Sequence, residues 1–382
     1  MVMSSVKSIL IFAAFYHPYK GGYVESIHGL SVGLLQRGYE ITIVACGEQG
    51  RTTCGEIDGI KLYNLSCWNP DWLNNSFPIP HPYSVYKVLK ILYKKNFDYI
   101  LTNTRFFIST WLGFIFGKSL GLPVIHIERG GQHSSTGNLF INFVAKIVDH
   151  TIGFIIVRFS NVVVGVSEAT CSFLLHLGAV KPVKIYNGIS VAPEKNVIYK
   201  NNLPYKITFV GRLIYAKGLT ELVQATASLS DNIIVQIIGG GPYKKDLEKI
   251  INELKLNKKI IFLGELNHQE IINILLESTI FINPSYSEGL PRCVLEAGSV
   301  GLPVIATDVG GTKEIICNEE HGILIIPKNI EAIIVSINKL INDIDLRERL
   351  GRNLKNRVKL VFNWDEIVSR YEKECFNTHN IL

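Results

Sequence analysis

This 382-residue sequence contains no Cys-x-x-Cys motif. Its seven cysteines are odd in number, and both observations argue against a zinc ribbon, a redox dithiol and a disulfide scaffold. The 14 prolines and 32 glycines are ordinary numbers and the hydrophobic share is 47%, which excludes disordered and collagen-like chains. We expect a globular protein of about two domains in a reducing cytosol.

Long apolar segments are also missing. The uncharged stretch Phe106–Gly117 is well short of the roughly 18 to 20 residues that cross a bilayer. The apolar run Ser8–Phe15 predicts a first strand rather than a signal peptide, because no charged lead precedes a long apolar core. We therefore expect no membrane crossing, and a location in the cytoplasm or at the inner face of a membrane.

Charged residues make up only 19% of the chain, and they are unevenly placed. Residues 1–190 hold 16 Lys and Arg against 10 Asp and Glu, whereas residues 191–382 hold 23 against 23. The net charge of +6 therefore belongs to the first half, which indicates an anionic partner there. A scatter of solvated cations is the open alternative. A nucleic acid partner is not expected.

Short apolar runs bounded by turn residues alternate with helix-like segments, which is typical of βαβ units and parallel sheets. The strands predicted in the first half are Ser8–Phe15, Glu40–Ala45, Lys61–Leu65, Tyr99–Thr102, Pro123–Glu128 and Asn161–Val166. Those predicted in the second half are Lys206–Val210, Ile233–Ile238, Lys259–Leu263, Thr279–Ile282, Pro303–Thr307 and Gly322–Ile325. The pattern predicts an α/β protein with two doubly wound, Rossmann-like domains that face a cleft.

The domain boundaries follow from this pattern. We expect the first domain to span 1–186 and the second 205–363, joined by a linker at 187–204 that is rich in Asn, Lys and Pro. The last helical stretch, Trp364 to Phe376, could return to pack on the first domain. Residues 364–382 would then complete that domain.

Glycines follow the first predicted strand. Gly21-Gly22 precede a helix expected to begin near Val24. Glycine lets a backbone approach a ligand closely, and the N–H groups of a helix start attract anions. The fingerprint Gly-x-Gly-x-x-Gly is absent there, which disfavours an NAD dehydrogenase. A simple tight turn is the alternative interpretation.

The second half opens in the same way. Gly211-Arg212 and then Lys217-Gly218 follow the strand Lys206–Val210. Two cations beside a strand-to-helix loop suit a diphosphate. Arg212 could donate two parallel hydrogen bonds to it, and Lys217 could contribute a point charge. A solvated surface pair is the alternative.

Two further turns follow the next strands. Gly239-Gly240-Gly241-Pro242 can continue neither a helix nor a strand, so it predicts an open turn with room for a base or a phosphate. Gly264-Glu265-Leu266 offers backbone groups at the same edge of the sheet. Those groups could hydrogen-bond a nucleobase.

The most specific segment runs from Asn283 to Ala297. Proline is tolerated only in the first helical turn, so Pro291 places Glu288 just before a helix. Glu296 is then about one and a half turns into that helix, on roughly the same side. The start of this helix attracts anions, and two carboxylates lie beside it. Carboxylates accept hydrogen bonds from hydroxyl groups, so the pair suits a ligand that carries a ribose and a sugar.

Glu288 and Glu296, with seven residues between them, resemble the signature of the retaining glycosyltransferases of family 4, which have the GT-B fold. The resemblance spans nearly the whole chain. It also takes in Gly21-Gly22, Gly211-Arg212, Lys217-Gly218, Gly239–Pro242 and Asn187-Gly188-Ile189. It implies that the C-terminal domain binds a nucleotide-diphosphate sugar and the N-terminal domain an acceptor.

The resemblance also implies residue roles. Glu296 would hold the ribose hydroxyls, Arg212 and Lys217 the diphosphate, and Leu266 the base through its backbone. Glu288 would face the donor sugar. The N–H groups of Gly289 and Leu290 would meet the sugar or phosphate, and the donor-binding glycines would be Gly21, Gly22, Gly240 and Gly241.

The sequence departs from the family pattern at one loop. Members of the family usually carry a His just after the strand that corresponds to Pro123–Glu128, whereas here Arg129 takes that place and His133 follows four residues later. Arg129 cannot act as a base, but it can stabilise a departing phosphate or orient the sugar. Both residues are catalytic candidates. His126 is expected to be a core residue of the strand.

The implied chemistry is transfer of a hexose-like unit with retained anomeric configuration. No Asp-x-Asp occurs in a predicted binding loop, so we expect no metal and no other cofactor. No second carboxylate stands at a convincing position for a covalent intermediate, which favours front-face attack by the acceptor hydroxyl.

The expected acceptor is a saccharide, and a lipid-linked one suits the basic first half. The apolar stretches Phe106–Phe116 and Phe140–Val157 border Lys118, Lys146 and Arg158, which would suit peripheral contact with a membrane. Sheet-covering helices are the alternative for both stretches. The pathway would then be synthesis of a surface polysaccharide, such as lipopolysaccharide O-antigen or capsule, or of a glycolipid. A nucleotide-sugar 2-epimerase of the same fold and a non-catalytic binding subunit remain alternatives.

Overall fold

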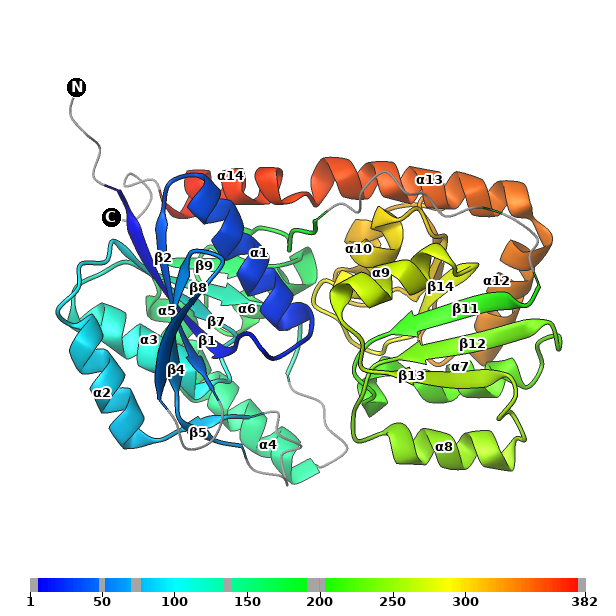
Figure 1. The fold of residues 1–382 in the computed structure, drawn as a ribbon, viewed down its shortest axis with the longest axis horizontal. Coiled ribbons are helices and arrows are strands. Elements are labelled where there is room, and N and C mark those ends of the chain that lie inside the picture. Colours follow the sequence, from blue (N-terminus) through cyan, green and yellow to red (C-terminus); the bar gives the residue numbers. More distant parts are fainter. Residues whose placement is uncertain are drawn as a thin grey trace. The chain divides into compact units, whose positions relative to one another are not determined.

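The structure is a computed structural model that describes residues 6–47, 52–69, 77–133, 139–190, 199 and 203–376. The chain divides into two compact units. Unit 1 comprises Met1–Ser134, Asn138–Gly188 and Trp364–Leu382, and unit 2 is built from Ile189–Asn363 (Figure 1). Most of the predicted linker 187–204 lies outside the described residues.

Unit 1 is built on a sheet with the strand order β10-β9-β8-β7-β1-β2-β4-β3. Its strands are β1 Ser8–Phe15, β2 Glu40–Cys46, β3 Thr53–Ile57, β4 Ile60–Leu65, β7 Tyr99–Asn103, β8 Val124–Glu128, β9 Val162–Gly165 and β10 Val183–Lys184. Neighbouring strands are parallel except β3 and β4, which pair antiparallel at the edge. The short strands β5 Cys67–Trp68 and β6 Ile79–Pro80 pair with each other.

Helices flank this sheet because its central strands are apolar on both faces. Phe12 of β1 is fully buried and packs with Phe116 of the helix above it. The helices of unit 1 are α1 Gly22–Gln36, α2 Pro82–Leu92, α3 Ile108–Ser119, α4 Leu139–Val148, α5 Phe154–Phe159, α6 Glu168–His176 and α14 Trp364–Cys375. A π-helical turn at Asp149–Gly153 connects α4 to α5.

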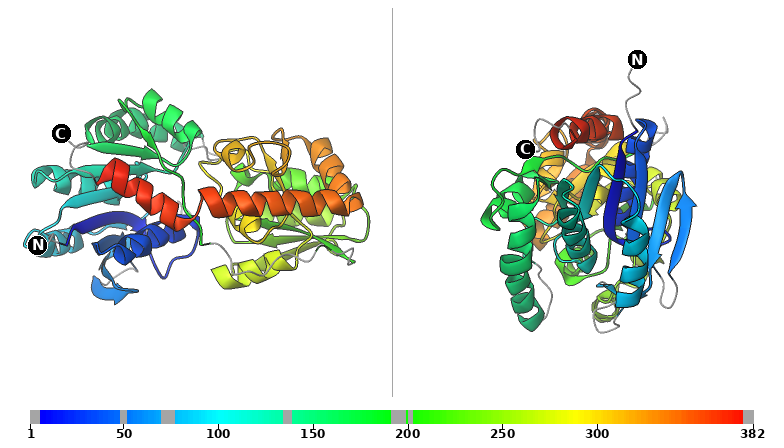
Figure 2. Two further views of the ribbon diagram at one scale, coloured as in Figure 1. Left: turned by 90° about the horizontal axis from the view of Figure 1, so that it is seen from above. Right: turned by 90° about the vertical axis from the view of Figure 1, so that its left-hand side faces the viewer.

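The C-terminal helix α14 lies beside α1 (Figures 1 and 2). Glycines in α1 allow this contact, since a Cβ on Gly29 would lie 2.2 Å from Trp364, and one on Gly33 would lie 2.6 Å from Val368. Arg37 then hydrogen-bonds the side chains of Glu372 and Ser369. Residues far apart in the sequence thus form one unit.

Unit 2 has a fully parallel sheet in the order β13-β12-β11-β14-β15-β16. Its strands are β11 Tyr205–Val210, β12 Ile233–Ile238, β13 Ile260–Gly264, β14 Ile280–Asn283, β15 Val304–Thr307 and β16 Ile323–Ile325. The helices are α7 Leu219–Thr226, α8 Lys244–Glu253, α9 His268–Leu276, α10 Arg292–Ser299, α11 Thr312–Ile315, α12 Ile330–Asn342 and α13 Ile344–Val361. The strand order reverses between β11 and β14, which makes this pair the topological switch point of the unit.

All the predicted strands are present, and each of their ends agrees to within one residue. The helix expected to begin near Val24 begins at Gly22, so Gly22 is its first residue rather than part of the loop before it. The stretch Phe106–Phe116 contributes to α3, which covers the sheet. Among the described residues, no helix combines the length and the apolar character that crossing a bilayer requires.

Candidate functional site

The loops after β11 and β14 meet in unit 2. The Tyr286 N–H donates to the Ala216 carbonyl at 2.8 Å. Gly218, at the start of α7, has φ +63°, and a Cβ there would lie 2.0 Å from the Pro284 oxygen. Only glycine fits that position without moving the neighbouring loop. Ligands bind at such switch points in open α/β sheets.

Lys217 and Glu288 connect these two loops. Lys217 Nζ lies 2.6 Å from Glu288 Oε1, with side chains 19% and 10% exposed. Asn283 Nδ2 donates to the same oxygen at 3.3 Å. Burial lowers the pKa of Lys217, but the nearby Glu288 carboxylate outweighs it and raises the pKa above its usual value. Lys217 is therefore a fixed cation.

Glu296 lies on α10, as predicted, and its carboxylate is 9% exposed. Its Oε1 accepts from Arg292 Nε at 3.0 Å, and His268 Nδ1 lies 3.6 Å away. Burial, and then the charge of Glu288, raise the pKa of the Cys293 thiol to about 12, with a further contribution from Glu296. Cys293 thus stays a thiol between two carboxylates.

Arg212 lies in the loop after β11, against the glycine turn. The Leu213 N–H donates to Gly240 O at 2.8 Å, and a Cβ on Gly239, which has φ +130°, would lie 2.0 Å from Gly211 O. Burial lowers the pKa of Arg212 and the Glu265 carboxylate opposes this. The turn therefore lies directly beside the guanidinium-bearing loop.

The remaining predicted residues of unit 2 lie at the same ends of the strands. Gly241 is the last glycine of the turn after β12, and Leu266 follows Glu265 in the short loop between β13 and Asn267, the N-cap of α9. Gly289 O accepts from the Gly311 N–H at 2.8 Å. Leu290 is buried just before α10. No side chain caps the N–H groups of α10.

In unit 1, Arg129 directly follows the last residue of β8, and its side chain reaches the end of the neighbouring strand β7. Its guanidinium donates to Asn103 Oδ1 at 3.2 Å and to Asn187 Oδ1, and it lies 5.9 Å from the centre of the Tyr23 ring. Asn103 ends β7, the neighbour of β1 at the switch point of unit 1. Arg129 is therefore held near that point.

Gly21 and Gly22 lie at the same switch point, after β1. Gly21, with φ +127°, is the N-cap of α1. A Cβ there would meet no atom within 4 Å, and no side chain caps the helix start. The structure thus leaves open space beside this glycine.

A buried ion network supports the Arg129 loop, and sequence reasoning missed its centre. Arg105, fully buried, contacts Glu128 at 3.0 Å and Asp149 at 2.7 Å. Burial raises the pKa of Glu128, but the Arg105 charge and His126 outweigh it and hold that pKa well below its usual range. His126 is buried and bonds Thr102, which confirms it as a core residue.

His133 is held by the same network. Its Nδ1 lies 2.6 Å from Asp149 Oδ2. His150 and His176, which sequence reasoning did not single out, lie beside it. A carboxylate inside the apolar run around Asp149 was the signal that could have pointed there.

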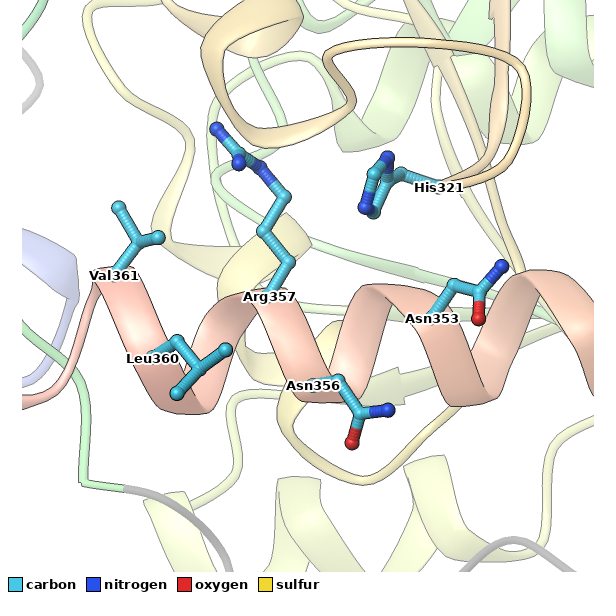
Figure 3. Close-up of a pocket in the computed structure, with 6 residues that line it drawn as sticks. All are labelled: His321, Asn353, Asn356, Arg357, Leu360 and Val361. Carbon is cyan, nitrogen blue, oxygen red and sulfur yellow. The ribbon is translucent and has the colours of Figure 1, made fainter.

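A separate pocket on unit 2 contains none of the predicted site residues. It is lined by His321 and, from α13, by Asn353, Asn356, Arg357, Leu360 and Val361 (Figure 3). The Arg357 guanidinium donates to the Glu314 and Ile315 carbonyls. Two nitrogens of the Arg357 guanidinium therefore hold the end of α11.

Two family models match the chain. "Glycosyltransferase Family 4" matches residues 20–192, and "Glycosyl transferases group 1" matches residues 192–357. An uncharacterised glycosyltransferase of Methanocaldococcus jannaschii is 30% identical over 96% of this chain and 97% of its own length. A UDP-Gal:alpha-D-GlcNAc-diphosphoundecaprenol alpha-1,3-galactosyltransferase of Escherichia coli is 27% identical, over 88% of this chain and 87% of its own.

Solved structures have the same fold. Sucrose-phosphate synthase from Thermosynechococcus elongatus has a TM-score of 0.78 at 18% identity, covering 96% of this chain and 98% of its own. HepE of Anabaena, solved in complex with UDP and glucose, has a TM-score of 0.76 at 19% identity and the same coverage.

The two α/β units, with a cation and a carboxylate paired at the switch point of the second, define a glycosyltransferase of the GT-B fold. Two family models that together span residues 20–357, with a glycosyltransferase relative that is similar along almost the whole chain, narrow this class to one family. The chain belongs to glycosyltransferase family 4.

Proposed function

We propose that the protein transfers a sugar, with retained anomeric configuration, from a nucleotide-diphosphate sugar to a lipid-linked saccharide. The donor is assigned to unit 2 and the acceptor to unit 1. The observation that carries the proposal is the Lys217–Glu288 pair at the switch point of unit 2, with 2.6 Å between Nζ and Oε1. A cation and a carboxylate there suit a ligand with both a phosphate and hydroxyl groups.

In this proposal Arg212 and Lys217 bind the diphosphate. The N–H groups at the start of α10, with those of Gly289 and Leu290, would add to the positive potential there. Lys217 is fixed by Glu288 before the ligand arrives, so it stabilises the charge that develops on the departing diphosphate without reorganising.

The other ends of the donor are assigned by the same reasoning. Glu296, buried except for 9% of its side chain, would accept hydrogen bonds from the ribose hydroxyls. Gly240 and Gly241 leave room for the nucleotide, and the backbone of Leu266 would bind the base. Glu288 would face the sugar.

We propose that this chemistry needs no metal, because the diphosphate charge is matched by Arg212, Lys217 and α10. The chain does contain an Asp-x-Asp, Asp343-Ile344-Asp345, at the start of α13. Asp343 there is the N-cap, and its Oδ1 accepts from the Leu346 N–H at 2.8 Å. This motif therefore caps a helix.

The groups of unit 1 would meet the sugar and the acceptor. Gly21 and Gly22 leave the start of α1 open to close approach. Arg129 and His133 leave β8 on one loop, and we propose that this loop faces the sugar being transferred. Front-face attack by the acceptor hydroxyl then requires no second carboxylate.

A lipid-linked acceptor is supported by an exposed apolar surface on α4 and α5. Its side chains are Phe143, Val144, Ile147, Phe154, Ile155 and Phe159, all exposed, with Lys146 and Arg158 among them. Apolar side chains beside cations suit the interface of an anionic membrane. The names of two relatives point the same way, since one acts on a diphosphoundecaprenol-linked sugar and another, from Homo sapiens, is a phosphatidylinositol N-acetylglucosaminyltransferase subunit. Surface polysaccharide or glycolipid synthesis is the pathway class that fits.

The test is transfer itself. The protein is incubated with radiolabelled UDP- and GDP-sugars and a membrane lipid extract, and the label is followed into the organic phase. Label in lipid supports the proposal. Isomerised free nucleotide sugar without lipid product would replace it with a 2-epimerase, and donor binding with neither outcome would replace it with a non-catalytic binding subunit.

Membrane contact has its own test. The wild-type protein should sediment together with vesicles of anionic lipid. The double variant Lys146→Glu/Arg158→Glu should stay in the supernatant. Equal sedimentation of the wild-type protein with neutral and anionic vesicles would contradict the electrostatic part of the proposal.

A further inference from the structure

We propose that unit 1 contains a binding site for a divalent transition metal, Zn²⁺ being the best match. Its ligands are His133 after β8, His150 in the π-helical turn and His176 at the end of α6. One ligand atom from each lies within 4.8 Å of the other two. The ring centres are 5.3, 5.7 and 6.0 Å apart.

His133 is oriented for this role. A carboxylate can only accept, so the 2.6 Å contact with Asp149 Oδ2 requires that His133 Nδ1 carries the proton. The lone pair is then on Nε2, the atom left for a metal. In zinc sites, the ring nitrogen of a ligating histidine that does not bind the metal commonly donates its proton to a carboxylate. This hydrogen bond fixes the tautomer and raises the basicity of the ring.

Asp149 is itself fixed. It is fully buried, and Arg105 Nε donates to its Oδ1 at 2.7 Å while a second guanidinium nitrogen lies 3.2 Å from Oδ2. Phe173 packs edge-on against the His133 ring, with 5.1 Å between centres. The ring is thus held on two sides before any metal binds.

The charge of the network also favours a cation at this place. The single charge of Arg105 faces two buried carboxylates, Glu128 and Asp149. A buried carboxylate is expensive unless it is paired, and Asp149 has contacts with both Arg105 and His133. A metal ion on His133 Nε2 would add positive charge on the side of the ring opposite Asp149.

The geometry needs only a small adjustment. Zn–N bonds of about 2.0–2.1 Å in a tetrahedron place ligand nitrogens about 3.4 Å apart. His150 and His176 are exposed, so their side chains are free to close on the metal. Three imidazoles with one open position suit Zn²⁺, with water as the fourth ligand.

A metal here would tie three segments of unit 1 together. His133 belongs to the loop that carries Arg129, so the ion would hold that loop against α6. The metal site shares His133 with the loop that we propose to face the sugar, but it shares no residue with the proposed donor site of unit 2. Metal binding is measured without any sugar transfer, so the failure of one proposal is distinguished from the failure of the other.

The experiment uses the full-length protein without a histidine tag. After removal of metals with a chelator, Zn²⁺ is titrated in competition with a chromophoric chelator, and Co²⁺ is titrated while its visible absorption is followed. We expect one equivalent of either metal, with the intense absorption of tetrahedral Co²⁺, and a higher melting temperature with the metal.

The variants are His150→Ala and His176→Ala, both at exposed positions. Each should weaken Zn²⁺ binding at least 10-fold with an unchanged circular dichroism spectrum. His81→Ala, which removes another exposed histidine of unit 1, should bind as the wild-type protein does. Absence of stoichiometric binding, or equal affinity in the wild-type protein and the His150→Ala/His176→Ala double variant, would overturn the proposal.

Discussion

Lys217 Nζ and Glu288 Oε1 lie 2.6 Å apart and connect the loops that follow β11 and β14. The two residues are separated by three strands in sequence but lie at one switch point. The pair keeps Lys217 charged and in place. It also leaves Glu288 as the carboxylate closest to the cation that would bind the donor diphosphate.

Glu288→Gln should therefore separate binding from chemistry. UDP, or GDP where a GDP-sugar is the donor that supports transfer, should bind without its sugar with an affinity within about 3-fold of the wild-type value, because Lys217 remains. Transfer should fall by about 10²- to 10³-fold in kcat, the usual loss when one group that stabilises a transition state is removed. Titration calorimetry with UDP and a transfer assay measure the two effects, and an equal loss in both would contradict the assignment of Glu288 to the sugar.

Glu296→Ala should weaken UDP binding. Loss of hydrogen bonds from ribose hydroxyls to a charged group costs about 1.5–3 kcal/mol, or about 10- to 100-fold in Kd. Glu253→Ala, at an exposed position on α8, is the matched control and should leave the affinity unchanged. If Glu296→Ala binds UDP as tightly as this control, Glu296 does not hold the ribose.

Arg129 is a proposed catalytic residue, and its contacts with Asn103 and Asn187 favour a role in orienting the sugar. Arg129→Ala should lower kcat by about 10²-fold or more, with unchanged affinity for UDP. Arg129→Lys should recover little, because a lysine cannot hold Asn103 and Asn187 through a planar fork. A full recovery in the lysine variant, measured by initial rates, would reduce the role of Arg129 to its charge alone.

The strands of the two parallel sheets could be predicted well from the sequence. A parallel strand buried on both faces consists of a short run of apolar residues, such as Ile233–Ile238. The prediction missed the edge strand β3, Thr53–Ile57, whose residues are largely exposed. An edge strand needs no apolar run, since one side of it faces solvent. The periodicity therefore carried no signal there.

Candidate site residues could be named from the sequence only where they lie close together along the chain. Glu288 and Glu296 lie within one segment, and so their spacing could be read. Arg105, by contrast, is paired with Glu128 and Asp149, which lie 23 and 44 residues away from it along the chain. No local pattern links residues that only tertiary packing brings together.

Close packing of the switch-point loops predicts a difference between two glycines. Gly218 and Gly264 have φ of +63° and +74°, but only at Gly218 would a Cβ meet another backbone atom, at 2.0 Å. Gly264→Ala should lose about 1–2 kcal/mol from the left-handed conformation alone. Gly218→Ala should lose about 1–3 kcal/mol more by overpacking. Urea unfolding measures both, and equal losses would contradict the tight contact.

Acid should weaken unit 1 through Glu128. Its pKa is lower in the folded state, so its stabilising contribution is complete above the unfolded pKa of about 4.3 and is lost as the pH falls below that value. Glu128→Gln should be less stable at neutral pH, and its urea midpoint should fall less steeply between about pH 5 and pH 3. Parallel pH profiles of the two proteins would exclude Glu128 as the cause.

The configuration of the newly formed glycosidic bond tests the central claim most directly. A nucleotide sugar that supports transfer is incubated with its acceptor, and the anomeric proton of the product is followed by NMR from the first turnovers. The account predicts a glycoside with the same anomeric configuration as the donor. An inverted product, or consumption of the nucleotide sugar without any glycoside, would contradict it.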